Sequence, residues 1–233
     1  ANATLALPSG LTVVGNTGIG TTSPTDTNGF SRALDVNGSS GAAVYTRTDG
    51  SATNRTVFAN SGTDGYVFNG GAGTLRFYTN ATQHMSIDST GAVSKPNQPA
   101  FLAFASANSN LAIDTAHTVA FGTEVYDQNA DFSSNIFTAP VTGRYFLNAN
   151  FYGTTIVNNA NYFWFYIETS NRTYSSIVDP GTLSESSSYH SLHVSAVADM
   201  DANDTAKVIV YQNGGSALSD LGGGTFFSGC LLA

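Results

Sequence analysis

Between Arg144 and Gly153 the side chains alternate between two sets, and this period of two predicts a long β-strand with two different faces. One set is apolar and predicts a face in the core: Tyr145, Leu147, Ala149 and Phe151. The other set mixes rings with polar groups and suits a face that meets another subunit or a wet groove: Arg144, Phe146, Asn148, Asn150 and Tyr152. Before the strand, Pro140 fixes φ and Gly143 permits φ > 0, which together predict a tight turn.

Turn residues punctuate positions 1–95 about every eight to twelve residues, including Asn-Gly at 28–29 and 37–38 and Asp-Gly at 49–50 and 64–65. Such dipeptides favour β-hairpins, and no helical period of useful length appears. The short runs between the turns predict strands at 11–14, 33–36, 42–47, 56–59, 66–69, 74–79 and 84–87. We expect a slender, hairpin-rich segment with a thin core, which gains stability by associating with copies of itself.

The run from Ser94 to Pro99 is the clearest linker in the chain, because Pro96 and Pro99 favour an extended and stiff connection. After it the apolar runs become longer and more aromatic. They predict strands at 100–105, 119–126, 144–153, 162–169, 173–178, 189–197, 207–212 and 225–232. A set of strands with loops and no helix predicts a double-sheet jelly roll. The predicted organisation is a β-rich segment over residues 1–95 and a jelly-roll head over residues 96–233.

Charged residues make up 10% of the 233-residue chain, well below the usual value of about a quarter. The 24 glycines and many Ser, Thr and Asn residues that replace them are typical of β-rich secreted or virion proteins. The formal net charge is −8, and the only lysines, Lys95 and Lys207, form no basic stripe. We therefore expect neither nucleic-acid binding nor insertion into a membrane, since no apolar stretch is long enough. The single cysteine, Cys230, excludes an intrachain disulfide.

No motif predicts a metal or a cofactor. His190 and His193 are three positions apart, which places them on opposite faces of a strand. Asp199, Asp201 and Asn203 resemble the start of a calcium loop, but position 204 is not the expected glycine and position 210 is not the expected glutamate. We interpret this run as an acidic turn between strands, and a weak calcium site completed by another loop is the alternative. We expect no cofactor.

The residues that could carry catalysis are scattered along the chain. No spacing singles out a pair of facing carboxylates, as a glycosidase needs, among Glu124, Asp127, Asp131, Glu168, Asp179 and Glu185. No nucleophile elbow of the G-x-S-x-G type occurs. The glycines at 15, 18 and 20 imitate a phosphate-binding loop, but Pro24 prevents the helix that such a loop needs, so we interpret them as a plain turn. We therefore expect a protein that is not an enzyme.

Loops rich in Ser, Thr, Asn, Gly and Tyr join the predicted strands of the head, at 153–161, 179–189 and 213–224. Such residues adapt well to polar ligands, as they do in antibody paratopes. The candidate receptor-binding residues in and beside these loops are Tyr152, Asn158, Asn159, Asn161 and Tyr189. The alternative is that the loops only connect strands.

Two strings in the first segment carry a recognisable pattern. One runs from Leu11 to Gly38 and contains the glycine-rich turn GIGTTSP. The other runs from Leu75 to Val93 and contains a hairpin pattern, F-Y-T-N followed by M-x-I-D-x-x-G, at Phe77, Tyr78, Thr79, Asn80, Met85, Ile87, Asp88 and Gly91. Both strings resemble segments of tail fibres and related structural proteins of tailed bacteriophages, although Gln83-His84 departs from the charged pair that is usual there. The resemblance implies a virion structural protein.

A second pattern runs through residues 100–233. It comprises F-x-x-P-x-x-G-x-Y at Phe137, Pro140, Gly143 and Tyr145, and a closing F-x-G-x-L-L at Phe227, Gly229, Leu231 and Leu232. With Phe101, FGTEVYD at 121–127 and ADMDANDTAKVIV at 198–210, these motifs resemble, in order, the globular head of the complement and tumour necrosis factor superfamily. Asn203 stands where that family tends to have glycine, and Leu147 where phenylalanine is commoner.

The second resemblance implies a homotrimer, because that family packs three jelly rolls around an axis through aromatic faces. The candidate residues for such an interface are Phe146, Tyr152, Tyr162, Trp164, Tyr166 and Phe226. For each of them, a place in the core of the monomer is the alternative.

These observations favour an all-β bacteriophage fibre on the outside of the virion, with a slender stem and a trimeric, tumour necrosis factor-like head. Its expected partners are copies of itself, other virion structural proteins and a glycan or protein of the host cell surface. The expected function is host attachment through the head. The alternatives are an architectural fibre or capsid decoration without an obligatory receptor, and a secreted bacterial adhesin or lectin.

Overall fold

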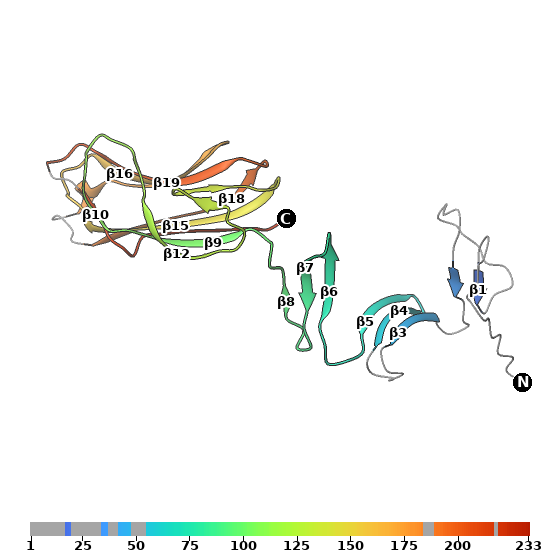
Figure 1. Ribbon diagram of the computed structural model, residues 1–233. Coiled ribbons are helices and arrows are strands. Elements are labelled where there is room, and N and C mark those ends of the chain that lie inside the picture. The colour runs from blue at the N-terminus through green and yellow to red at the C-terminus, as the bar shows by residue number, and fades with distance from the viewer. Residues whose placement is uncertain (1–16, 20–33, 37–41, 48–54, 184–188, 217–218) are drawn as a thin grey trace, which may run out of the picture. The chain divides into compact units, whose positions relative to one another are not determined.

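The computed structural model describes residues 17–19, 34–36, 42–47, 55–183, 189–216 and 219–233 (Figure 1). Strands dominate these residues, and their one helical element is a short 3₁₀ turn, η1, at Pro180–Thr182. The predicted all-β class is therefore confirmed. The chain divides into two compact units, Ala1–Ser94 and Lys95–Ala233. The boundary between them falls within the predicted linker, Ser94 to Pro99.

The first unit contains a parallel pair of short strands, β1 at Thr17–Ile19 and β2 at Leu34–Val36. Gly18 lies opposite Asp35 in this pair. The interpretation of the glycines at 15, 18 and 20 as a plain turn is thus wrong for residues 17–19, because backbone pairing with β2 draws this stretch into a strand. The predicted strand at residues 11–14 lies outside the described residues.

Two antiparallel sheets of three strands also belong to the first unit. One contains β3 (Ala42–Arg47), β4 (Arg55–Ser61) and β5 (Asp64–Asn69), and the other contains β6 (Leu75–Thr79), β7 (Thr82–Ile87) and β8 (Val93–Ser94). Among the residues of this unit whose burial is described, Val57 is the one large hydrophobic side chain that is buried. Val44, Phe58 and Val67 instead form an exposed row across the first of these sheets.

The hairpin between β6 and β7 turns at Asn80 and Ala81, which both have positive φ, 47° and 59°. Thr79 and Thr82 pair directly across it, so the loop has two residues. Positive φ at both loop positions defines the type I′ turn, whose twist matches that of the flanking strands. Asparagine tolerates this conformation better than most residues, which explains its place in the fibre-like string.

The turn after β7 is organised by the carboxylate of Asp88. One of its oxygens accepts hydrogen bonds from Thr90 Oγ1 at 2.7 Å, from Thr90 N at 2.8 Å and from Ala92 N at 3.0 Å. Gly91 has a φ of 90°, which a side chain would strain. The D-x-x-G part of the fibre-like string is therefore a self-contained Asx turn that leads into β8.

The Asp88 turn should weaken in acid. The hydrogen bonds from Thr90, the side-chain bond above all, hold the pKa of the Asp88 carboxyl below its ordinary value of 3.8. Because the folded pKa is depressed, the carboxylate contributes stability above the ordinary pKa, and that stability is lost as pH falls through the depressed value. We expect NMR titration to give an Asp88 pKa below 3.8, with loss of exchange protection in β8 at lower pH. Asp88→Ala should remove the exchange protection of β8 at neutral pH, whereas the control, Ser89→Ala, should retain it. An Asp88 pKa at or above 3.8 would contradict the stabilising role of the Asp88 carboxylate.

The second unit, the head, is a sandwich of two sheets. The first sheet has seven strands: β9 (Ala100–Ala105), β10 (Asn108–Leu111), β12 (Phe121–Asp127), β15 (Gly143–Thr155), β18 (His190–Met200), β20 (Ser219–Leu221) and β21 (Phe226–Leu231). At its centre β15 pairs with β18 on one side and with β21 and β20 on the other. Beyond β21 the sheet continues through β9 to β12.

The second sheet of the head has six strands: β11 (His117–Thr118), β13 (Phe132–Ser133), β14 (Ile136–Thr138), β16 (Tyr162–Thr169), β17 (Thr173–Val178) and β19 (Thr205–Asn213). β19 lies between β14 and β16, and β16 also pairs with β17. Figure 1 shows the two sheets stacked face to face. This double-sheet arrangement is the jelly roll that the strand pattern predicted.

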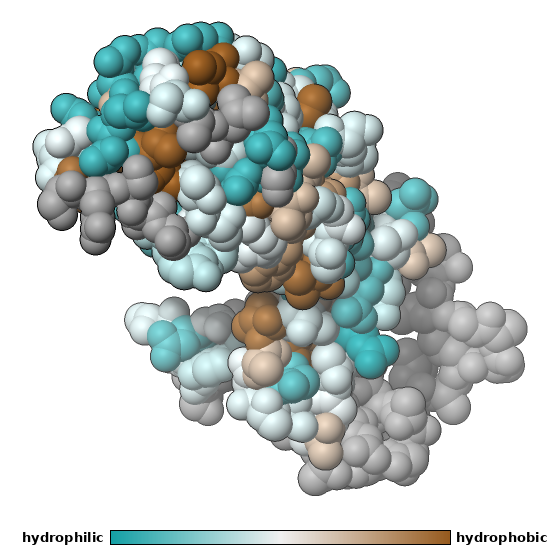
Figure 2. All heavy atoms as spheres, turned by 90° about the vertical axis from the view of Figure 1, so that its left-hand side faces the viewer, coloured by the Kyte–Doolittle hydropathy of each residue, from teal (hydrophilic) through white to brown (hydrophobic). Residues whose placement is uncertain are grey.

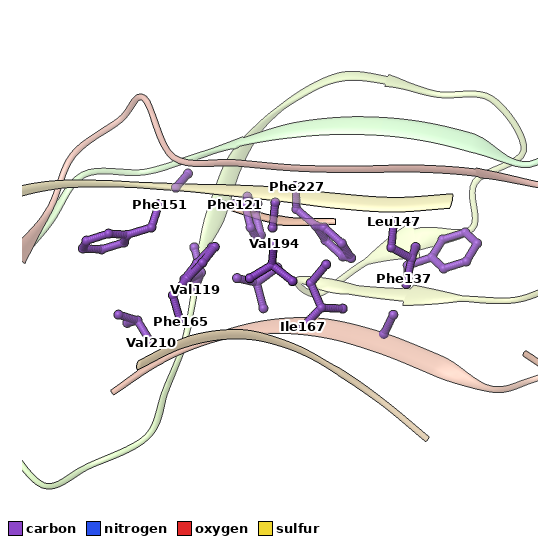
Figure 3. Packing of buried hydrophobic residues seen from close by; sticks show 14 of the residues in the cluster. Val119, Phe121, Phe137, Leu147, Phe151, Phe165, Ile167, Val194, Val210 and Phe227 are labelled. Carbon is purple, nitrogen blue, oxygen red and sulfur yellow. The ribbon is translucent and has the colours of Figure 1, made fainter. Parts of the chain in front are cut away.

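The core of the head fills the space between the two sheets, as Figure 3 shows. Near one end Phe101, with no exposed surface, stacks on Phe132 and Phe137 at ring distances of 4.8 and 4.9 Å. Phe227 meets the same ring edge-on at 4.9 Å. Further along, Phe151 of β15 packs against Phe165 of the other sheet at 5.6 Å. Aromatic contacts therefore join the sheets over the length of the sandwich.

β15 has the two faces that its alternation predicted. All four residues of the apolar set are at 0% exposure: Tyr145, Leu147, Ala149 and Phe151. The expectation for Gly143 is wrong, because this residue does not adopt a positive φ. Its role is to leave space, since a Cβ there would lie 2.6 Å from the carbonyl oxygen of Ala233 and 2.7 Å from Leu231 Cδ1.

Candidate functional site

Four loops meet at the end of the head opposite Pro99 and Gly143, and we call this end the distal end. They span residues 112–116, 156–161, 179–189 and 214–218, of which 184–188 and 217–218 lie outside the described residues. Strand register gathers them, because Gly153 pairs with both His190 and Leu221. Figure 2 views the molecule from this side, and hydrophilic residues cover most of the coloured surface of the head, with small hydrophobic groups between them.

Two of the predicted receptor-binding asparagines tie the distal loops to one another. Asn159 Nδ2 donates to Ser216 Oγ at 2.7 Å, and Asn159 Oδ1 accepts from Ser216 N at 3.2 Å. Asn161 Nδ2 donates to Asn213 Oδ1 at 2.8 Å. Asn158 lies beside them and is half-buried. These hydrogen bonds hold residues 159–161 and 213–216 in one arrangement before any ligand binds.

The two predicted receptor-binding tyrosines stack on each other at the distal end. The rings of Tyr152 and Tyr189 are 5.9 Å apart and nearly parallel, at 11°. Tyr189 is 66% exposed, whereas Tyr152 is half-buried. The Tyr152 ring lies against Gly222, and a side chain at position 222 would clash with it, because its Cβ would be 2.6 Å from Tyr152 Cδ1. The five predicted receptor-binding residues therefore lie at the same end of the head, and their role stays a prediction.

Charge is distributed unevenly between the two ends of the head. Its lysines and arginines are Lys95, Arg144, Arg172 and Lys207, and none belongs to a distal loop. The described distal carboxylates are occupied by hydrogen bonds within the fold: Asp179 Oδ1 accepts from Gly181 N at 2.8 Å, and Asp220 accepts from Asn110 N at 2.7 Å. The distal end is thus polar and weakly acidic, with no lysine or arginine to attract an anion.

Asp114 joins two of the distal loops, 112–116 and 214–218, and its removal should loosen this contact without unfolding the head. Its Oδ1 accepts from Asn213 Nδ2 at 2.9 Å and from Gly214 N at 3.0 Å, across a wide gap in sequence. We expect Asp114→Ala to speed hydrogen exchange of the Gly214 amide by about tenfold, as loss of a surface hydrogen bond does. Thr118→Ala, on the exposed side of β11, is the matched control. An unchanged Gly214 exchange rate in Asp114→Ala would contradict this role.

Two of the predicted interface residues, Phe146 and Phe226, lie on the outward side of the seven-stranded sheet. We call this side the seven-stranded face. It carries two apolar rows across neighbouring strands, one of Val197, Phe146 and Cys230, the other of Phe104 and Phe226. Phe146 is 39% exposed and Val197 is 55% exposed. No described element of the head covers this face, so it is apolar surface available for association.

The other predicted interface residues, Tyr162, Trp164 and Tyr166, lie on the outward side of the six-stranded sheet. Their neighbours in β16, Phe163 and Phe165, point into the core, which fixes the direction of the three rings. The structure therefore separates the predicted interface residues onto opposite faces of the sandwich. Tyr152, the remaining candidate, shares its side of β15 with Phe146.

Asn150 is a feature of the seven-stranded face that the sequence did not single out as special. Its Nδ2 donates to Gly224 O at 3.3 Å, whereas its Oδ1 is buried and has no hydrogen-bond partner among the described residues. Register places it between His193 of β18 and Phe226 of β21. A buried acceptor without a donor costs stability, so Asn150 marks a point where an additional donor would be favourable.

The acidic run from Asp199 to Asp204 begins with the last two residues of β18 and continues through the turn, residues 201–204, that leads into β19. Asp199 is bound by Arg172, with Nη2 to Oδ2 at 2.6 Å and Nε to Oδ1 at 3.1 Å, and this bond lowers the pKa of the Asp199 carboxyl. Asn203 has a φ of 75°, a backbone conformation that glycine and asparagine adopt more readily than other residues. The turn borders a hollow of about 410 Å³ lined by Thr142, Gly143, Arg144, Asn171, Asp199, Met200, Asp201 and Ala233.

In the described part of the chain, no three His, Cys, Asp or Glu side chains lie close enough together to hold a metal ion. His190 is half-buried and His193 is exposed, as expected for opposite faces of β18. None of the helical structure described is long and apolar enough to span a membrane.

Comparison with known proteins gives matches among solved structures only. The chain is similar to the globular domain of zebrafish complement 1qA, with 18% sequence identity and a TM-score of 0.41, over 58% of this chain and 98% of that one. It is also similar to murine APRIL, with 15% identity and a TM-score of 0.44, over 58% of this chain and 99% of that one. No protein-family model and no curated protein matches the chain.

Proposed function

We propose that this protein is a bacteriophage virion fibre whose head binds the surface of the host cell. The observation that carries the proposal is the distal end, where polar loops are cross-linked by hydrogen bonds at the end of the head remote from the point at which the chain enters it. The fibre-like string around Asn80 and Asp88, which forms a compact hairpin and turn, supports the virion assignment. In this proposal the first unit connects the head to other structural proteins of the virion.

Self-association is the first requirement of this function. In the first unit, the row of Val44, Phe58 and Val67 is exposed on one face of its sheet, where no described residue buries it. A sheet of three strands needs an apolar partner to be stable in water, and copies of the same chain supply one. The seven-stranded face of the head offers a second such surface. We infer a homotrimer, because the motifs around Pro140 and Gly143 resemble those of a trimeric family.

The seven-stranded face is the one that we assign to the threefold axis of the head. Two surfaces on opposite sides of a sandwich cannot both face one axis, so only one of the two aromatic faces can line it. The seven-stranded face exposes more of its large apolar side chains and carries the unpartnered Asn150 Oδ1. A neighbouring subunit would cover those side chains and can supply the missing donor.

The fibre proposal is tested by competition for host cells. Purified full-length protein is added to cells before virions, and adsorption of virions is measured. Each head would bind weakly, but three heads per fibre raise the avidity by roughly a hundredfold or more. We expect reduced adsorption that changes little with moderate salt, because few charges are involved. Unchanged adsorption at saturating protein, together with antibody labelling of the capsid, would favour the architectural fibre instead.

A further inference from the structure

A row of aromatic side chains runs along the outward side of the six-stranded sheet, and we call it the aromatic stripe. It consists of Tyr162, Trp164 and Tyr166 of β16 and Tyr211 of β19. The rings of Trp164 and Tyr166 are 4.5 Å apart, and those of Tyr162 and Tyr211 are 6.0 Å apart. Trp164 and Tyr211 are direct partners in the sheet, so the two ring pairs are adjacent. The stripe extends for about 14 Å along β16.

The aromatic stripe is formed in advance and belongs neither to the core nor to the assigned trimer face. Tyr166 is 9% exposed and covers Ile209, which is 3% exposed, whereas Tyr162, Trp164 and Tyr211 remain half-exposed. The rings therefore support one another and leave their outer surfaces in water. Trp and Tyr side chains held in this way contact a ligand at low cost in conformational entropy.

Amide and hydroxyl groups and one carboxylate lie beside the distal part of the stripe. Asn213 Nδ2 lies 3.3 Å from the Tyr211 hydroxyl and 2.9 Å from Asp114 Oδ1, and Asn161 Nδ2 donates to Asn213 Oδ1. At the other end of the stripe, burial, followed by the charge of Glu168, raises the pKa of the Tyr166 hydroxyl above its ordinary value, so this hydroxyl also stays protonated. Amides and hydroxyls beside ring faces complement a ligand that has hydroxyls on an apolar ring.

Charge excludes an anionic ligand at the stripe. Lys207 is the one basic residue on this side of the six-stranded sheet, and it is paired with Glu168 at 3.3 Å. The distal loops add carboxylates and no Lys or Arg, including in the sequence at 184–188 and 217–218. A sulfated, phosphorylated or sialylated ligand would meet repulsion from Asp114 without a compensating cation.

A protein partner also fits the stripe poorly. A stable protein interface buries about 800 Å² on each partner, and its centre is made of well-exposed anchors. On this face Ile177 is 60% exposed, but the rings beside it are half-buried against each other. The stripe is thus a narrow platform with polar ends.

We propose that the aromatic stripe is a binding platform for a neutral glycan, with sugar rings stacked on Trp164 and Tyr211 and hydroxyls bound by Asn213 and Asp114. This assignment rests on the proposed host-binding function and names the class of its receptor. Binding should persist in moderate salt, because no ion pair forms between the protein and the sugar.

Trp164 provides a direct reporter of binding, because it is the only tryptophan in the chain. Full-length protein is titrated with neutral polysaccharides (mannan, galactan, β-glucan and dextran) and with anionic ones (hyaluronan and polysialic acid), and Trp emission is recorded. We expect a saturable change with at least one neutral glycan and none with the anionic ones. Tyr211→Ala, which retains Trp164, should weaken that binding by about tenfold or more. Tyr78→Ala, an exposed tyrosine of the first unit, is the control and should bind as the unaltered protein does.

Two outcomes of the titration would overturn the assignment: no emission change with any of the neutral glycans, or equal binding by Tyr211→Ala and the unaltered protein. Competition for adsorption to host cells distinguishes failure of the stripe assignment from failure of the fibre proposal. If Tyr211→Ala competes with virions as well as the unaltered protein does, the receptor binds elsewhere and the stripe assignment fails, while the fibre proposal stands. If glycans alter Trp emission but the protein never competes with virions, the fibre proposal fails and the stripe assignment stands.

Discussion

Phe101→Ala should lower the free energy of unfolding of the head by about 3–5 kcal/mol. The ring has no exposed surface and touches three other rings, those of Phe132, Phe137 and Phe227, at centroid distances of 4.8–4.9 Å. These rings come from β13, β14 and β21, so the cavity would open where both sheets meet. A loss of this size is a large part of the 5–15 kcal/mol by which domains are usually stable.

Urea unfolding of residues 95–233 at one fixed protein concentration measures this effect, since assembly makes apparent stability depend on concentration. Ile177→Ala is the matched control, because Ile177 is 60% exposed and its removal leaves no cavity. We expect the control to unfold within about 0.5 kcal/mol of the unaltered head. A Phe101→Ala head as stable as that control would mean that the ring cluster does not join the two sheets.

Phe146→Asp should dissociate the proposed trimer while leaving each head folded. Phe146 is 39% exposed on the seven-stranded face, between Val197 and Cys230, so the isolated head tolerates a polar side chain there. In the assembled head the same carboxylate would be buried among apolar groups of a neighbouring subunit. An unpaired buried charge costs several kcal/mol, which corresponds to a loss of affinity of at least about a hundredfold.

Ile177→Asp provides the matched control for Phe146→Asp, because it places the same charge on the opposite face of the sandwich. Light scattering should give a monomer mass for Phe146→Asp and an unchanged mass for Ile177→Asp. Circular dichroism of both variants should retain the β-sheet spectrum, which separates dissociation from unfolding. The reverse result, with dissociation only in Ile177→Asp, would assign the axis to the face that carries Trp164.

Alternation along the chain predicted the long strands of the head well, because a strand between core and surface must have two different faces. The ranges of β9, β16 and β17 agree with the sequence prediction, and those of β12, β15, β18, β19 and β21 differ by no more than three residues at either end. The five strands that were not predicted, β10, β11, β13, β14 and β20, have two to four residues each. So few residues show no period, and their pairing depends on partners distant in sequence.

The candidate sites were predicted less completely than the strands, for a physical reason. A period of two shows that Phe146 and Trp164 point away from the core, but it does not show which sheet each strand joins. Only the pairing of the strands assigns the two residues to different sheets. Phe146 lies opposite Val197 and Cys230 in one sheet. Trp164 lies opposite Tyr211 and Ile177 in the other. Likewise, no local pattern indicates that Asn161 would bond to Asn213, because the contact depends on the register of β16 and β19.

The mass of the head in solution tests the central claim, a trimer closed through the seven-stranded face, most directly. Residues 95–233 form one compact unit with its own core, so the head is measured without the first unit. Light scattering over a dilution series at micromolar concentration should give three times the monomer mass. A monomer mass throughout that series would contradict the trimer, and with it the assignment of Phe146, Phe226 and Asn150 to a threefold axis.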